Sequence, residues 1–137
     1  MLIINYQFLI VHYKLRIMRE NIVNTKSFEF AIRIVKLYQY LSVEKREYIL
    51  SKQLLRSGTS VGAMIRESEH AESKLDFIHK LAIAQKEANE TVYWLQLLKA
   101  TNYLNDKEYE NIIIDAVEIL KLITSILKTT KAQIINK

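Results

Sequence analysis

Two acid-x-x-His motifs are the residues in this chain whose spacing comes closest to that of a metal site. Glu67 precedes His70 by three positions, and Asp76 precedes His79 by the same interval. Di-iron helical bundles place a Glu-x-x-His motif on each of two helices and a further Glu on each of two others. Here both motifs flank one predicted turn, and the other predicted helices offer no inward carboxylate. We therefore predict that these side chains are solvated, with no bound metal and no cofactor.

Glu87 and Glu90 are spaced as neighbours on a helix, which an acid–base pair would require. No nucleophile or phosphate-binding loop accompanies them, so no set of catalytic residues emerges. Ion pairs with Arg56 or Arg66 of the preceding helix explain the two carboxylates better, because such pairs are common in helical bundles. The sequence therefore predicts a protein that is not an enzyme and has no small-molecule substrate.

Basic side chains are the feature that best suggests binding. Residues 1–66 contain 11 Lys and Arg against 4 Asp and Glu, residues 67–118 contain 5 against 11, and residues 119–137 contain four Lys and no acid. Cations gathered on one face neutralise nucleic-acid phosphates without reading base sequence. The predicted contacts to RNA or DNA are Arg33, Lys36, Lys45, Arg46, Lys52, Arg56 and Arg66, with Lys121, Lys128 and Lys131 as further candidates.

The same charge distribution supports an alternative function. The acidic middle of the chain could attract the basic helices of a neighbouring subunit, so that the asymmetry serves assembly. The protein would then be a scaffold for protein partners and would not bind nucleic acid.

Aromatic residues also leave two interpretations open. Tyr93 and Trp94, with Tyr38, Tyr40 and Tyr103, could stack on the bases of a single strand. Tyrosine and tryptophan at helical spacing also pack as anchors in a core or at a subunit interface.

Composition limits the fold class to all-α. The chain has 137 residues, enough for one domain, and it contains two glycines and no proline. A sheet protein of this size would need many more turn residues. The absence of cysteine excludes disulfides and thiolate metal sites, and it fits the reducing cytoplasm, where we expect the protein to be found.

Apolar residues at spacings of three and four predict four helices. These helices span about 27–42, 44–70, 73–103 and 106–131, within a domain over 18–133 that is followed by a tail over 134–137. Short connections favour antiparallel neighbours, so the expected topology is an up-down-up-down four-helix bundle.

The first and third helices have the clearest predicted stripes. Ser27 is the expected N-cap of the first helix. Its stripe would be Phe28, Ala31, Val35, Tyr38 and either Leu41 or Ser42. The third helix repeats with a period of 3.5 residues, which is typical of a bundle seam. That seam consists of Phe77, Leu81, Ala84, Ala88, Thr91, Leu95 and Leu98.

A run of small residues interrupts the second helix, at Ser57, Gly58, Ser60 and Gly62. Glycine costs a helix about 1 kcal/mol relative to alanine, so helix propensity alone permits a break here. Close packing against another helix would offset that cost and keep the helix continuous.

The fourth helix carries apolar residues on more than one face, including the run Ile112-Ile113-Ile114. A helix of this kind contacts more than one neighbour. In a lone bundle part of this surface would face water, so we expect a homo-oligomer.

Residues 1–17 form a strongly apolar extension that precedes the domain. The segment is shorter than the roughly 20 residues a membrane-spanning helix needs. Its Lys14 and Arg16 follow the apolar part, whereas a secretory signal carries its charge first. We predict no membrane association. A strand, a loose arm and a helix all fit its composition.

The stretch from Gln53 to Leu98 resembles the small four-helix-bundle proteins encoded within intervening sequences of bacterial 23S rRNA genes. The matching residues are Arg56, Ser57, Ser60, Val61, Gly62, Ala63, Ile65, Arg66, Glu67, Glu87, Glu90, Thr91, Tyr93, Trp94 and Leu95. The resemblance extends over about Met18 to Gln133. Many members have Asn at the position of Met64, so a polar contact made there in relatives would be missing here.

This resemblance implies a fold and an assembly that go beyond the residue patterns. Proteins similar to this one form four-helix bundles, and relatives close into homopentameric rings. A related bundle, the accessory protein of diversity-generating retroelements, forms a basic pentameric barrel that binds nucleic acid and its reverse transcriptase. The resemblance thus implies a pentamer and makes nucleic acid a candidate partner.

Overall fold

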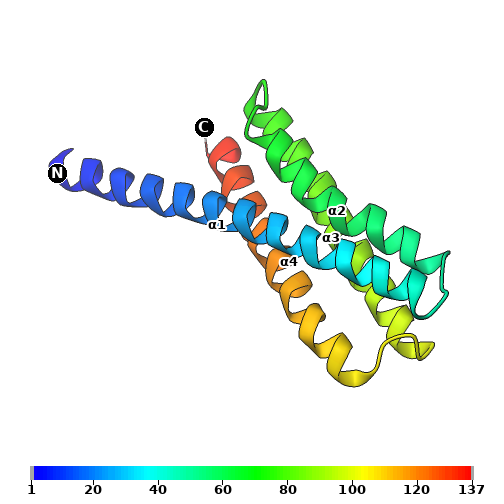
Figure 1. Ribbon diagram of the computed structural model, residues 1–137. Coiled ribbons are helices and arrows are strands. Elements are labelled where there is room, and N and C mark those ends of the chain that lie inside the picture. Colours follow the sequence, from blue (N-terminus) through cyan, green and yellow to red (C-terminus); the bar gives the residue numbers. More distant parts are fainter. Residues whose placement is uncertain (1, 137) are drawn as a thin grey trace.

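The computed structural model describes the backbone of residues 2–136 and the side chains of residues 5–136. Its elements are α1 (Leu2–Val43), α2 (Leu50–Ser68), α3 (Lys74–Ala100) and α4 (Asp106–Ile135), with no strand in this range. Each helix packs against two others, in the cyclic order α1, α2, α3, α4. The α1–α2 and α3–α4 turns lie at one end, and the α2–α3 turn lies at the other (Figure 1). The predicted all-α fold with four helices is confirmed.

The first helix is longer than the predicted span of 27–42. Ser27 lies inside α1 and is fully buried, and its hydroxyl donates to the carbonyl of Asn24 at 3.0 Å instead of capping a helix. Val23, one turn earlier on the same face, is also buried in the core. Packing of this preceding turn extends the helix past the expected cap, because tertiary contacts supply most of the stability of a helix.

The buried stripe of α1 also differs from the predicted one. Phe28 is 54% exposed and Val35 is 38% exposed. Leu41 is buried as predicted, but the other buried residues are Val23, Ser27, Phe30 and Ile34. Both sets follow helical spacing, because α1 is apolar on two faces, so periodicity alone could not identify the buried one.

The other helix boundaries shift by a few residues. The second helix begins at Leu50 and not at 44, because residues 44–49 form a turn, and it ends at Ser68 and not at 70. It is continuous through the small residues, as close packing predicted. The third helix is capped by Ser73, which accepts from the Asp76 amide, and it ends at Ala100 before Asn102, whose φ is 66°. That left-handed residue stops the helix short of the predicted 103.

The fourth helix begins with a capping box formed by Asn105 and Glu108. It continues to Ile135 and not 131, so Ile134 and Ile135 of the predicted tail over 134–137 are helical, and Lys137 lies outside the described residues. Beyond the predicted end, Gln133 accepts from Arg16 of α1 at 3.4 Å, which holds the added turn against α1.

The core follows the predicted seam of α3. In α3 the buried positions are Leu81, Ala84, Ala88, Thr91, Leu95 and Leu98, which are the predicted set apart from the half-buried Phe77. In α4 the wide apolar surface is mostly covered within the subunit. Ile112 is buried and Ile113 half-buried, while Ile114 remains exposed.

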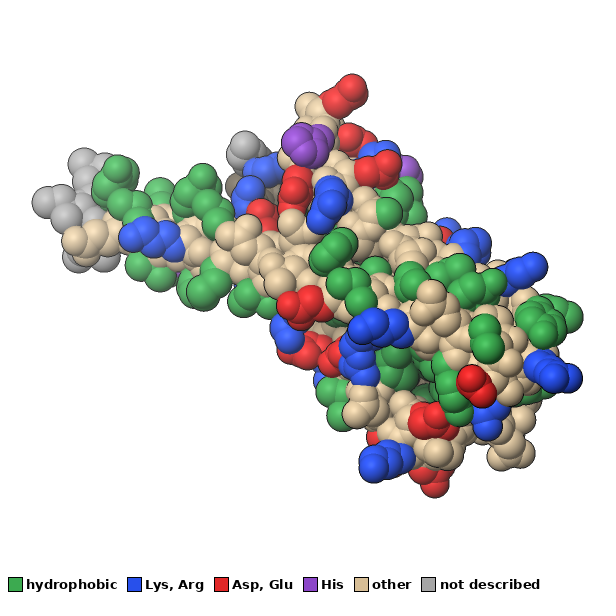
Figure 2. Space-filling view, viewed as in Figure 1, with side chains coloured by type: hydrophobic (Ala, Val, Ile, Leu, Met, Phe, Trp, Pro, Cys, Tyr) green, Lys and Arg blue, Asp and Glu red, His purple; other side chains and the backbone are tan. Residues whose placement is uncertain are grey.

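The largest exposed apolar surface lies on α1 and not on α4. Residues 2–17 are helical and project from the bundle (Figure 1), and exposed apolar side chains lie along residues 6–17 (Figure 2). No described helix has the length and apolarity needed to cross a bilayer.

Candidate nucleic-acid interface

The predicted basic set separates into two groups. The first group is held by other side chains of the same subunit. Arg56 donates to Glu87 at 3.1 Å and forms an ion pair with Glu90, which joins α2 to α3. The Glu90 carboxylate accepts hydrogen bonds from Arg56 and, at 3.0 Å, from the Trp94 indole. Both hold the pKa of Glu90 below its usual value, with Arg56 the larger cause. The predicted pairing of Glu87 and Glu90 with Arg56 is confirmed.

Arg33 and Arg66 are engaged as well. Arg33 pairs with Asp115 and also donates to Asn111 on α4. The guanidinium of Arg66 lies 5.6 Å from the centre of the Phe28 ring, a cation–π arrangement, and not on a carboxylate. These contacts reduce the charge that Arg33, Arg56 and Arg66 could offer to a phosphate.

The acidic middle of the chain is therefore neutralised largely within the subunit. Besides the Arg33 and Arg56 pairs, Lys26 donates to Glu118 at 2.9 Å. All of these pairs join a basic residue of α1 or α2 to an acid of α3 or α4. The charge asymmetry read from the sequence thus serves packing between helices of one chain.

The second group keeps its charge available. It consists of Lys36, Lys45, Arg46 and Lys52, none of which forms an ion pair with a described side chain. We call these four residues the basic tip. They lie on the last turns of α1, in the α1–α2 turn and at the start of α2. Figure 2 shows Lys and Arg side chains standing out from this end, opposite the N-terminal projection.

The α1–α2 turn is a rigid support for the tip. The amides of Glu44 and Lys45 both donate to the Tyr40 carbonyl, at 2.9 and 3.3 Å. The Glu47 amide reaches the Leu41 carbonyl at 2.9 Å. Arg46 has a φ of 54°, the left-handed conformation that lets the chain reverse so tightly.

Glu47 is an important residue that the sequence analysis missed. Its buried carboxylate accepts from the amides of Ile49 at 3.0 Å, Leu50 at 2.8 Å and Ser51 at 2.7 Å, so it caps α2. Burial raises the pKa of Glu47. The three hydrogen bonds from backbone amides lower it by more, so the pKa lies below its usual value. The sequence held no clear signal for this cap, because Glu is not among the residue types preferred at helix N-caps.

The cap predicts a pH-dependent stability. Glu47→Gln should lower the free energy of unfolding by about 1 kcal/mol at pH 7, since it loses the charge-assisted part of the cap. Because the pKa is lowered in the folded state, the carboxylate stabilises above its unfolded pKa. This contribution is lost as pH falls through the folded value. Urea unfolding at pH 7 and pH 3 should show the two proteins converging in acid. Glu44→Gln, at an exposed position of the same turn, should change little, and equal losses at both pH values would contradict this role.

The aromatic candidates occupy different environments. Tyr38, Tyr40 and Tyr103 are half-buried, and Lys45 lies 5.9 Å from the centre of the Tyr40 ring. Trp94 is half-buried, whereas Tyr93 is 54% exposed in the middle of α3. The structure adds Tyr48, also 54% exposed, which stands beside the basic tip in the α1–α2 turn.

The small residues of α2 allow close packing between helices. A Cβ at Gly58 would lie 2.8 Å from Ile34, and one at Gly62 would lie 3.3 Å from the Ser27 carbonyl, so both glycines bring α1 close. Ser57 accepts from the Thr91 hydroxyl at 3.0 Å inside the core. The Ser60 hydroxyl donates back to the Arg56 carbonyl.

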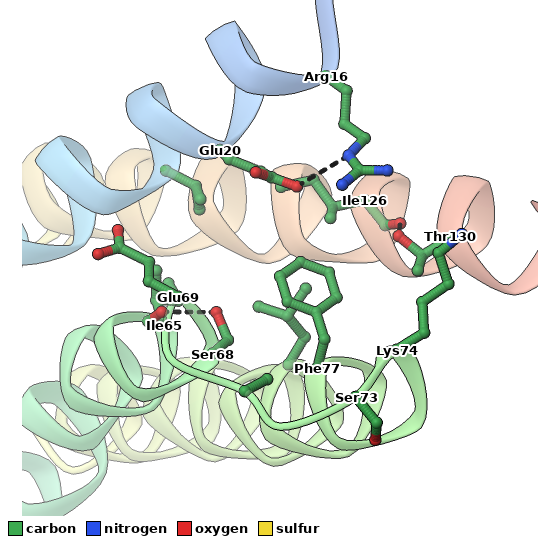
Figure 3. A pocket seen from close by; sticks show the side chains of 13 residues that line it. Arg16, Glu20, Ile65, Ser68, Glu69, Ser73, Lys74, Phe77, Ile126 and Thr130 are labelled. Atoms are coloured by element: carbon green, nitrogen blue, oxygen red, sulfur yellow. Dashed lines mark hydrogen bonds and ion pairs between the residues drawn. The ribbon is translucent and has the colours of Figure 1, made fainter. Parts of the chain in front are cut away.

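A cavity of about 350 Å³ lies at the opposite end, near the α2–α3 turn. Phe77 projects into this region from α3, and Arg16 and Glu20 of α1 face each other at 3.3 Å (Figure 3). Its floor is apolar, and its lining lacks a nucleophile paired with a base. Across residues 2–136, no three His, Asp or Glu side chains converge as metal ligands would, so the two acid-x-x-His motifs do not join.

Comparisons with known proteins agree with this fold. The model of the 23S rRNA-intervening sequence protein family matches residues 19–125, which begin where α1 reaches the bundle. A crystal structure of a protein with unknown function from the S23 ribosomal protein family of Bacteroides thetaiotaomicron is 57% identical in sequence. The match covers 80% of this chain and 98% of that chain, with a TM-score of 0.79. No curated protein matches the sequence. The chain belongs to the 23S rRNA-intervening sequence protein family.

Proposed function

We propose that this protein is a non-enzymatic, oligomeric bundle of the cytoplasm that binds RNA through the phosphate contacts of its basic tip. The observation that carries the proposal is the gathering of Lys36, Lys45, Arg46 and Lys52 at one end, without acidic partners among the described side chains. Such cations attract a polyanion, because binding releases its condensed counterions.

Two further observations support a nucleic acid over a protein partner. Four of the acids that might have recruited basic helices of another subunit are occupied within the chain, namely Glu87, Glu90, Asp115 and Glu118. The family name links these proteins to 23S rRNA, so RNA is the first ligand to test, with DNA of the same sequence beside it.

The direct test is the affinity of the purified protein for a fluorescent RNA, measured by anisotropy at several salt concentrations. Three or four phosphate contacts should give a slope of about −2 to −3 in log K against log salt, at roughly −0.7 per contact with a single strand. An RNA that fails to bind even at low salt would rule out the proposal.

Assembly is part of the same proposal. An antiparallel up-down-up-down order, which the positions of the turns in Figure 1 support, places every tip of a closed ring on one face. Several tips held together raise the effective concentration of cations around one RNA chain. The exposed side chains of Phe28, Ile32 and Val35 on α1 give such a ring an apolar surface to bury.

Light scattering coupled to size exclusion measures the subunit number. We expect five subunits, and replacing Phe28 and Ile32 with Ser should shift the mass toward one subunit. A wild-type protein that elutes as a monomer would contradict the ring but not the RNA contacts of a single tip.

A further inference from the structure

We infer that the basic tip recognises unpaired nucleotides, with the ring of Tyr48 as a stacking surface for a base. This inference rests on the proposed function and specifies which form of nucleic acid the tip takes. The observation behind it is the juxtaposition, within one short turn, of exposed cations and an exposed aromatic side chain.

The exposure of Tyr48 has no explanation in the fold. A tyrosine ring usually buries much of its apolar area, yet Tyr48 is 54% exposed and forms no aromatic pair among the described residues. Its neighbour Ile49 is 77% exposed. Tyr48 therefore contributes little to the core, and its apolar surface is available to a ligand.

The turn holds the ring and the charges in fixed positions. Hydrogen bonds from backbone amides to the Tyr40 and Leu41 carbonyls fix the chain before Tyr48. After Tyr48, the carboxylate of Glu47 accepts hydrogen bonds from the first amides of α2. Binding to a rigid surface costs less conformational entropy than ordering a flexible loop. The turn is thus already arranged for contact.

Local charge is favourable for a phosphate chain. Lys45 and Arg46 precede Tyr48, and Lys52 follows it on the first turn of α2. Of the two acids in this turn, Glu47 is buried and directs both carboxylate oxygens to the α2 amides, so Glu44 is the one exposed acid of the turn itself. The phosphates of one strand could follow the cations while a base reaches the ring.

Stacking on a protruding side chain selects single-stranded over double-stranded ligands. In a duplex both faces of each base are covered by neighbouring pairs, whereas unpaired bases in loops and single strands stack on aromatic rings. Phosphate contacts alone would not make this distinction. Tyr48 accordingly supplies a preference that the four cations of the tip lack.

The experiment compares Tyr48→Ala with Tyr13→Ala, using a 12-nucleotide single-stranded RNA and the same sequence as a duplex. Tyr13 is a matched control, because it is 61% exposed and lies on the N-terminal projection of α1, away from the tip. We expect Tyr48→Ala to weaken single-strand binding by about 5-fold to 100-fold, the range for one stacked base. Duplex binding and the salt slope should stay unchanged, Tyr48→Phe should bind as the wild type, and Tyr13→Ala should have no effect.

The outcomes separate this inference from the proposal beneath it. If Tyr48→Ala binds the single strand as tightly as the wild type does, the stacking role is wrong and phosphate binding stands. An equal loss of affinity for single strand and duplex would have the same meaning. Failure of the wild type to bind either RNA at low salt would overturn both. Circular dichroism of each variant shows whether it is folded, and Tyr48→Phe keeps the test decisive if the alanine variant unfolds.

Discussion

Removing the charge of the α1–α2 turn should abolish most of the RNA affinity. We expect the variant Lys45→Glu/Arg46→Asn/Lys52→Glu to bind a single-stranded RNA about 100-fold more weakly at 0.1 M salt. Each phosphate contact raises the affinity about 5-fold at 0.1 M salt compared with 1 M salt, and the variant loses three such contacts. The same anisotropy titration should show a shallower salt slope. Asparagine is chosen at position 46 because it tolerates the left-handed φ of 54° found there.

A matched control separates the tip from general electrostatic attraction. The variant Lys121→Glu/Lys128→Glu/Lys131→Gln changes the net charge by the same amount, using exposed lysines of α4. Lys128 and Lys131 lie toward the end where Arg19 of α1 contacts Ser125, away from the tip. This control should retain most of the affinity. If both triple variants lose equal affinity, total charge and not the tip is responsible.

Gly58→Val should destabilise the bundle by about 2–3 kcal/mol, because overpacking of a well-packed core costs about this much. A Cβ at position 58 would lie 2.8 Å and 2.9 Å from the two Cγ atoms of Ile34. These atoms cannot move aside easily, since Ile34 is fully buried and β-branched side chains are stiff in helices. Urea unfolding should show a lower midpoint with an unchanged slope.

Two companion variants test that explanation. Ala63→Val places the same side chain at an exposed position of α2 and should cost only about 0.5 kcal/mol of helix propensity. Ile34→Ala removes the clashing atoms, so Gly58→Val should cost at least about 1 kcal/mol less in that background. An identical cost of Gly58→Val in both backgrounds would show that contact with Ile34 is not the cause.

Among the binding residues, the sequence identified the types but could not sort them. Arg56 and Lys52 are equally basic in the printed chain, yet one is paired with Glu87 and the other has no acidic partner among the described side chains. The partners are about thirty residues away, and only the packing of α2 on α3 brings them together. Periodicity reports faces of a helix and not the pairing of two charges.

Local signals were reliable where the packing environment was simple. The 3.5-residue repeat of α3 predicted its buried seam from Leu81 to Leu98, because this helix has one apolar stripe. Helical spacing did not identify the buried face of α1. Phe28 and Ile34 both fit such spacing, and contact with α2 is what buries Ile34.

The sequence by itself determined that the protein is an all-α chain of four helices, because an almost complete lack of glycine and proline leaves few other folds open. At the small residues of α2, helix propensity left both a break and a continuous helix open, and the structure shows the continuous one. Only the tertiary structure decided where α1 begins, which of its faces is buried and which cations remain unpaired. The physical reason is that helical spacing is a property of a few neighbouring residues, whereas burial and ion pairing depend on side chains that the chain brings together from a distance.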